Sequence, residues 1–276
     1  MNKILVTTDF SSNSQAAIRF AIQLASQHPY HLTFFHSTNL DQPTSWSKAI
    51  YESHEYSETK QTLTQLQGFV KEVYHAMGMQ ASNFDCVVRN NAATDQNIMQ
   101  HAEENGYSFI CLSKNGENKS NKWFGSTTST LIKKSNTPVI AVPSNYQAEK
   151  ILKVAYATDL KDLDTELEKV VSFTEPLAAQ LELLHFSNPA DTLMEPAQKE
   201  AINNNIKEHH LITRFETFDI EKTLIENMNE AFQKSKPSMV VMFTEQNRTL
   251  FEKIFSSSIS AEYASVSEIP LLVISK

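Results

Sequence analysis

Short runs of β-branched and aromatic residues alternate with longer stretches of helical spacing along this chain of 276 residues. In the first half, five such runs predict strands: Ile4–Val6, Leu32–Phe35, Cys86–Val88, Phe109–Leu112 and Val139–Val142. Helices are predicted between them: Ser14–Gln27, Ser45–Met77, Thr94–Glu104 and Thr127–Ser135. Strands that alternate with crossover helices form parallel sheets covered on both faces, so the predicted fold class is α/β.

The same order of strands and helices recurs in the second half. The strands expected there are Val154–Ala157, Leu181–Phe186, Leu211–Phe218, Met239–Phe243 and Leu271–Ile274. Some details recur in register, since Asp9 and Asp159 each follow a first strand, and His36 and His185 each end a second one. The chain is therefore predicted to be a tandem repeat of two five-stranded parallel-sheet domains, residues 1–145 and 150–276, joined by a short polar linker.

The predicted topology places a candidate site before any motif is considered. Open parallel sheets bind ligands in the crevice beyond the carboxyl ends of their strands. In the first domain, Asp9, Ser37 and the loop after Leu112 follow such strand ends. We expect them to converge on one crevice.

The chain contains only five glycines, and none lies in the last 151 residues: Gly68, Gly78, Gly106, Gly116 and Gly125. Glycine lets the backbone approach a phosphate group closely, so a glycine-rich phosphate loop is excluded after residue 125. The first three glycines lie at predicted helix interiors or helix ends, and Gly106 fits the position just after a helix. Only Gly116 and Gly125 bear on function.

Charge and apolar patterning exclude further classes of protein. Lys+Arg and Asp+Glu both number 11 over residues 1–145, but 13 and 21 over residues 146–276, so the whole net charge of −8 lies in the second half. Such an acidic surface repels phosphates, and nucleic-acid binding is not expected.

No apolar run approaches the roughly 18 residues of a membrane span, and no secretory signal is apparent, so we expect a soluble, cytoplasmic protein. Cys86 and Cys111 lie in apolar runs and are expected to be packed thiols.

The segment from Cys111 to Ser129 is the most informative for chemistry. It contains a strand, a loop with Gly116 and three lysines, and Gly125-Ser-Thr at the start of a helix. A helix N-terminus with adjacent hydroxyls can hold an anion such as a triphosphate. The same residues also fit a helix N-cap beside a solvated basic loop.

The chain resembles the universal stress protein (UspA) family in its tandem two-domain form. Three segments carry the resemblance: Ile4-Leu-Val-Thr-Thr-Asp9-Phe-Ser, Ala102-Glu-Glu-Asn-Gly-Tyr-Ser-Phe-Ile-Cys-Leu-Ser113 and Ile132-Lys-Lys-Ser-Asn-Thr-Pro-Val-Ile-Ala-Val142. The resemblance implies that each domain has the Rossmann-like, adenine nucleotide alpha hydrolase-like fold. It also implies an internal pseudo-dimer in which the last strands of the two domains pair, and it leaves open a further homodimer.

The nucleotide-binding branch of that family carries Gly-x2-Gly-x9-Gly-[Ser/Thr] after the fourth strand. Here Ser113 replaces the first glycine, Gly116 is the second, and Gly125-Ser126 ends the motif after eight residues instead of nine. The resemblance implies that ATP or another adenine nucleotide binds with Mg, Asp9 accepting from the ribose hydroxyls. The implied binding residues are Thr7, Asp9, Ser37, Ser113, Gly116, Gly125, Ser126 and Thr127.

The second domain has lost the corresponding motif. Thr244, Asn247 and Ser257 stand where the three glycines belong. We therefore expect a structural or regulatory role for this domain, with Asp159 as a strand-end or helix-capping residue.

The predicted function is that of a stress-response binding protein with an adenine-nucleotide site in its first domain. The alternative is a regulatory or protein-interaction scaffold of the same fold that binds protein partners and no nucleotide. Enzyme activity is not expected, because the chain has neither a Gly-x-Ser-x-Gly elbow nor a P-loop motif. Neither a catalytic residue nor a metal site is predicted, and a structural role is expected for His36 and His185.

Overall fold

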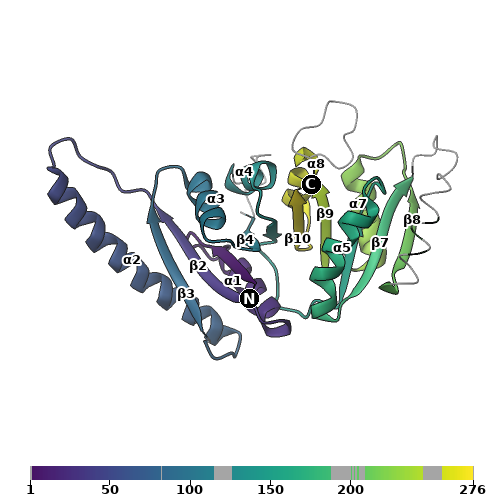
Figure 1. The fold of residues 1–276 in the computed structure, drawn as a ribbon, viewed down its shortest axis with the longest axis horizontal. Coiled ribbons are helices and arrows are strands. Elements are labelled where there is room, and N and C mark those ends of the chain that lie inside the picture. The colour runs from purple at the N-terminus through teal and green to yellow at the C-terminus, as the bar shows by residue number, and fades with distance from the viewer. Residues whose placement is uncertain are drawn as a thin grey trace. The chain divides into compact units, whose positions relative to one another are not determined.

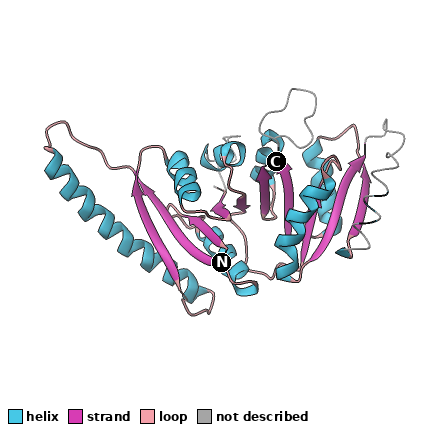
Figure 2. Ribbon diagram, in the orientation of Figure 1, coloured by secondary structure: helices cyan, strands magenta, loops and turns pink. Residues whose placement is uncertain are grey.

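The computed structural model describes residues 2–81, 83–114, 126–187, 200, 202, 204, 209–244 and 257–275. The chain divides into two compact units, Met1–Ala148 and Glu149–Lys276. Each unit is an α/β structure with a parallel sheet and helices (Figure 1, Figure 2).

The sheet of the first unit contains the five predicted strands. Its strands are β1 (Lys3–Thr7), β2 (His31–Thr38), β3 (Phe84–Asn90), β4 (Phe109–Ser113) and β5 (Val139–Val142). They are arranged in the order β3-β2-β1-β4-β5, and every neighbouring pair is parallel. The prediction of a parallel sheet is confirmed for this unit.

Four helices connect these strands: α1 (Gln15–Gln27), α2 (Lys48–Ala76), α3 (Thr94–Glu104) and α4 (Ser126–Lys134). The bounds of α3 are those predicted. Helix α2 begins later than the predicted Ser45, because Ser47 caps it by accepting the backbone N–H of Ile50. In Figure 1, α2 runs beside β3.

The helices lie in two layers, one on each face of the sheet. Phe34 of β2 contacts Phe84, which stacks on Tyr74 of α2, whereas the adjacent Phe35 stacks on His101 of α3. Adjacent residues of a strand point to opposite faces. Helices α2 and α3 therefore cover opposite faces, and most of the first unit's core lies between these layers and the sheet.

The second unit has the same strand order. Its strands are β6 (Lys153–Ala157), β7 (Gln180–Ser187), β8 (Ile212–Thr217), β9 (Met239–Thr244) and β10 (Leu271–Ser275), and its described helices are α5 (Leu163–Thr174), the short η1 (Glu175–Leu177), α7 (Leu224–Ser235) and α8 (Ser257–Val266). The order is β10-β9-β6-β7-β8, again with every pair parallel. All five strands predicted for this half are confirmed.

The first part of the predicted linker belongs to the first unit. Tyr146 is buried, with its ring 5.4 Å from that of Phe20, and its carbonyl oxygen accepts from the guanidinium of Arg19. These contacts hold the end of the first unit against α1. The pairing of the two units through β5 and β10 stays a prediction.

The glycines and cysteines of the described residues lie where the sequence indicates. Gly68 is inside α2, whereas Gly78 and Gly106 follow α2 and α3 with φ of +67° and +61°. Cys111 is buried, Cys86 is half-buried, and both are free thiols. Among the residues that the structure describes, no helix has the length and apolar character that a membrane span requires.

Candidate functional site

In the first unit the direction of winding changes between β1 and β4. The chain passes from β1 to β2 and β3 on one side, and then returns to β4 on the other side of β1 (Figure 1). Ligands of open parallel sheets bind at the carboxyl ends of the strands at such a switch point. Thr7 ends β1 and Ser113 ends β4, so both lie at this position.

Asp9 lies two residues beyond β1 and is exposed. Its Oδ1 accepts from the backbone N–H of Ser11, at 3.0 Å, and from the Ser11 hydroxyl. Partial removal of the Asp9 carboxyl from water acts to raise its pKa, but the hydrogen bonds from Ser11 and Ser14 outweigh this effect and leave the pKa below its ordinary value. The site therefore presents an ionised carboxylate in a fixed orientation.

The backbone next to Asp9 has an uncommon conformation. Phe10 has φ of +63°, a region that residues other than glycine rarely adopt. Its N–H donates to the Thr8 hydroxyl, and its ring lies 4.5 Å from that of His36 and 5.5 Å from that of Phe69. These contacts stabilise the turn that places Asp9 at the edge of the sheet.

The second unit repeats this turn. Leu160 has φ of +66°, and its N–H donates to the hydroxyl of Thr158 at 2.9 Å. The N–H of Lys161 donates to Asp159 Oδ1 at 3.1 Å, as that of Ser11 does to Asp9. The two aspartates therefore share this backbone hydrogen bond, while the Ser11 hydroxyl adds a second bond to Asp9.

His36 and His185 occupy matching positions and make matching contacts. Nδ1 of His36 lies 2.8 Å from the carbonyl oxygen of Thr8, and Nδ1 of His185 lies 2.9 Å from that of Thr158. A carbonyl oxygen can only accept, so Nδ1 carries the hydrogen in both rings. This contact joins the second strand to the loop after the first, which agrees with the predicted structural role.

The remaining predicted site residues lie at the carboxyl edge, where they are described. Thr7, Ser37, Ser113 and Thr127 are half-buried. Because α4 leads back to β5, its first turn, with Thr127, lies at the same edge as the ends of β1, β2 and β4. Gly116 and Gly125 lie outside the described residues, and so does the side chain of Ser126, whose backbone begins α4.

Thr7 and Ser37 share one face of the sheet. Thr7 pairs in register with Phe35, which stacks on His101 of α3, and Ser37 lies two residues further along β2. On the same face, the side-chain amide of Asn97 donates to the Ser37 hydroxyl at 2.8 Å. Sequence reasoning missed Asn97, although comparison of the two halves could have found it, because Asn227 is also the fourth residue of its helix.

The corresponding edge of the second unit differs chemically. Thr244 ends β9 and is fully buried, and its hydroxyl has no hydrogen-bond partner in the described part of the chain. The hydroxyl of Tyr156 donates to the buried carboxylate of Glu166, and its oxygen lies 3.0 Å from Thr158 Oγ1. The first unit has Val6 and Ala16 at the positions of Tyr156 and Glu166, so this polar network belongs to the second unit alone.

The described residues contain no cluster of side chains that could bind a metal ion. No three His, Cys, Asp or Glu side chains gather there as they would around a metal ion. Asp9 and the hydroxyl groups around it are instead suited to hydrogen bonding with a ligand that carries hydroxyls.

Comparison with known proteins relates the chain to one family. The model of the Universal stress protein family matches residues 1–143. No curated protein matches the chain.

Several solved structures are similar to the chain. A universal stress protein from Archaeoglobus fulgidus DSM 4304 is 16% identical, with a TM-score of 0.70, and the match covers 100% of this chain and 96% of that one. A functionally unknown protein from Pseudomonas aeruginosa PAO1 is 14% identical, with a TM-score of 0.62 and coverage of 100% and 92%. At these identities the likeness concerns the fold, over the full length of the chain.

Proposed function

Because the chain belongs to the universal stress protein family, we propose that it is a stress-response binding protein that takes an adenine nucleotide, such as ATP with Mg, at the carboxyl edge of its first unit. The observation that carries this proposal is the ionised, exposed carboxylate of Asp9 at the switch point between β1 and β4. A carboxylate readily accepts hydrogen bonds from two hydroxyl groups, and the ribose of a nucleotide has two such groups. In this role Asp9 would orient the ribose.

The same edge has a place for the phosphates. The first turn of α4 has backbone N–H groups without helical partners and the positive end of the helix dipole, which favour anions. Thr127 adds a half-buried hydroxyl there. The residues present thus fit both ends of a nucleotide, with ribose at Asp9 and phosphates at α4.

The second unit is proposed to bind no nucleotide and to have a structural or regulatory role. Its Thr244 hydroxyl is buried, and residues 126–276 contain no glycine that would let a phosphate approach the backbone. The unit also accounts for the acidic half of the chain. Binding, rather than turnover of the nucleotide, is the proposed activity of the whole protein.

Thermal melting with and without millimolar Mg-ATP tests the proposal. A ligand at 100 times its Kd adds about 2.7 kcal/mol to the free energy of unfolding, which raises the melting temperature measurably. Asp9→Asn retains an oxygen for the N–H of Ser11 but removes the charge, so the shift should be lost. Asp159→Asn is the matched control, because Asp159 has the same local hydrogen bond in the second unit.

The outcomes separate the two functions considered. A shift in the parent and in Asp159→Asn, but not in Asp9→Asn, supports nucleotide binding by the first unit. A shift that Asp159→Asn loses instead would move the site to the second unit. No shift in the parent would overturn the proposal and favour the interaction scaffold.

A further inference from the structure

A buried amide lies directly beneath one of the proposed binding residues. Asn97 is 3% exposed, and its Nδ2 lies 2.8 Å from Ser37 Oγ and 3.4 Å from the carbonyl oxygen of Arg89. The residue is in the first turns of α3, on the face of the sheet that Ser37 shares with Thr7. Of these two contacts, the one with the Ser37 hydroxyl links Asn97 to the edge of the sheet.

The Arg89 carbonyl fixes which end of the amide faces Ser37. An amide oxygen would be repelled by a carbonyl oxygen, so the group on that side must be the NH2. Ser37 Oγ therefore accepts from Asn97, and its own hydrogen is left to donate. The acceptor for that hydrogen is the Asn91 carbonyl at 3.4 Å, which is long for a hydroxyl hydrogen bond. A closer acceptor on a ligand would take its place.

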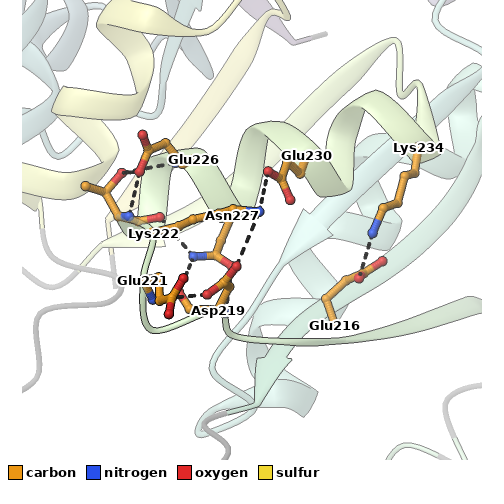
Figure 3. A network of polar contacts seen from close by, with 9 residues as sticks. Glu216, Asp219, Glu221, Lys222, Glu226, Asn227, Glu230 and Lys234 are labelled. Carbon is orange, nitrogen blue, oxygen red and sulfur yellow. Dashed lines mark hydrogen bonds and ion pairs between the residues drawn. The ribbon is translucent and has the colours of Figure 1, made fainter.

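The corresponding buried amide of the second unit makes different hydrogen bonds. Asn227, the fourth residue of α7, is 6% exposed; its oxygen accepts from the N–H of Asp219 at 2.9 Å. Its NH2 donates to the carbonyl oxygens of Asp219 and Thr223, both at 3.0 Å. Figure 3 shows this amide turned toward the Asp219 loop. Phe186, with no hydroxyl, follows His185 as Ser37 follows His36.

We propose that Asn97 is a positioning residue of the nucleotide site, which holds the Ser37 hydroxyl as a hydrogen-bond donor toward the ligand. The inference rests on the proposed function and adds a chemical requirement that the ligand must meet. The ligand must present an acceptor atom at Ser37, as the ring nitrogens of a purine do. The sister amide in the second unit only holds a loop in place.

Calorimetric titration with Mg-ATP tests this inference through a double-mutant cycle. Asn97→Asp keeps the shape of the side chain but replaces the donor with an acceptor, so Ser37 would turn its hydrogen inward. We expect Ser37→Ala and Asn97→Asp each to weaken binding about tenfold, because each removes the same hydrogen bond. The double variant should bind no more weakly than the single variants, since Asn97 acts only through Ser37.

Asn227→Asp is the matched control in the second unit. It places a carboxylate against two carbonyl oxygens, as Asn97→Asp does against one, and should leave the affinity for Mg-ATP within about twofold of the parent. If Asn97→Asp does not fold, as judged by circular dichroism, Asn97→Ala replaces it in the cycle. The expected coupling with Ser37→Ala is the same.

Three results would overturn the inference. Parental affinity in the Asn97 variant would show that the amide serves the fold alone. Losses that multiply in the double variant would show that Asn97 and Ser37 act independently. Absence of Mg-ATP binding by the parent would overturn the proposed function and this inference together, and is distinguished from the other two by the parent's titration alone.

Discussion

His36 donates its Nδ1–H to the carbonyl oxygen of Thr8, 2.8 Å away, and so ties the loop that carries Asp9 to the end of β2. Loss of this bond leaves a backbone carbonyl without its partner. We expect His36→Ala to lower the free energy of unfolding by at least about 1 kcal/mol. His36→Asn, whose amide can donate in the same place, should lose less. Melting curves without nucleotide compare the two, and equal losses would contradict the structural role.

Glu182 forms the buried centre of an ion-pair network in the second unit. Its side chain is fully buried on β7, where it pairs with Lys153 and, at 2.8 Å, with Nε of Arg214. Glu182→Gln leaves Lys153 without this carboxylate and Arg214 with Glu216 alone, so it should cost about 3 kcal/mol, at the lower end of the range for a broken buried pair. Urea unfolding monitored by circular dichroism measures this loss.

An exposed ion pair in the first unit provides the control for Glu182. Lys48 and Glu52 lie 3.6 Å apart, with side chains that are 88% and 59% exposed. Such pairs contribute less than about 1 kcal/mol. If Glu52→Gln lost as much stability as Glu182→Gln, the expected difference between exposed and buried ion pairs would be contradicted.

The network also predicts how stability depends on pH. Burial acts to raise the pKa of Glu182, but the hydrogen bonds from Lys153, Ser235 and Arg214 outweigh it and lower the pKa from its ordinary value of 4.5. The stability that Glu182 contributes is therefore present above pH 4.5 and is lost as the pH falls through the lowered value. The parent should lose more stability than Glu182→Gln over that acidic range.

Gly68 lies inside α2, and a Cβ added there would meet no atom within 4 Å. Alanine has the higher helix propensity, so Gly68→Ala should stabilise the protein by about 1 kcal/mol. Gly78 has equally open surroundings but φ of +67°, which alanine adopts only with strain. Gly78→Ala should therefore destabilise, and melting changes of the same sign would contradict this account.

His101 adds a pH dependence of its own. Burial, with the nearby charge of Arg89, lowers its pKa from 6.5 despite the opposing charge of Glu104, and its Nε2 is buried without a hydrogen-bond partner in the described residues. The unfolded chain then binds more protons than the native one below pH 6.5, so stability falls as the pH drops through this range. His101→Phe, which retains the stacking on Phe35, should flatten this dependence. An unchanged pH profile would show that His101 does not cause it.

The sequence predicted all ten strands, because each is a short apolar run bounded by turns or helical spacing. It also predicted α3 with its observed bounds. The positive φ of Phe10 and Leu160 could not be predicted, since such conformations are usually assigned to glycine or asparagine.

The burial of two polar residues could not be predicted from the sequence either. Glu182 alternates with leucines in β7, a pattern typical of a solvent-facing charge, yet Lys153 and Arg214 enclose it. Asn97 resembles any polar residue of a helical first turn until the fold brings Ser37 within 2.8 Å. In both cases the deciding partners come from other elements of the unit.

The stoichiometry of Mg-ATP binding, measured by calorimetry on the full chain, shows directly whether the first unit alone binds a nucleotide. We expect one nucleotide per chain, because among the described residues Asp9 is exposed, whereas its counterpart Asp159 is half-buried and Thr244 at the end of β9 is fully buried. We also expect Asp9→Asn to abolish this binding. Two nucleotides per chain, or binding that persists in Asp9→Asn, would contradict these expectations.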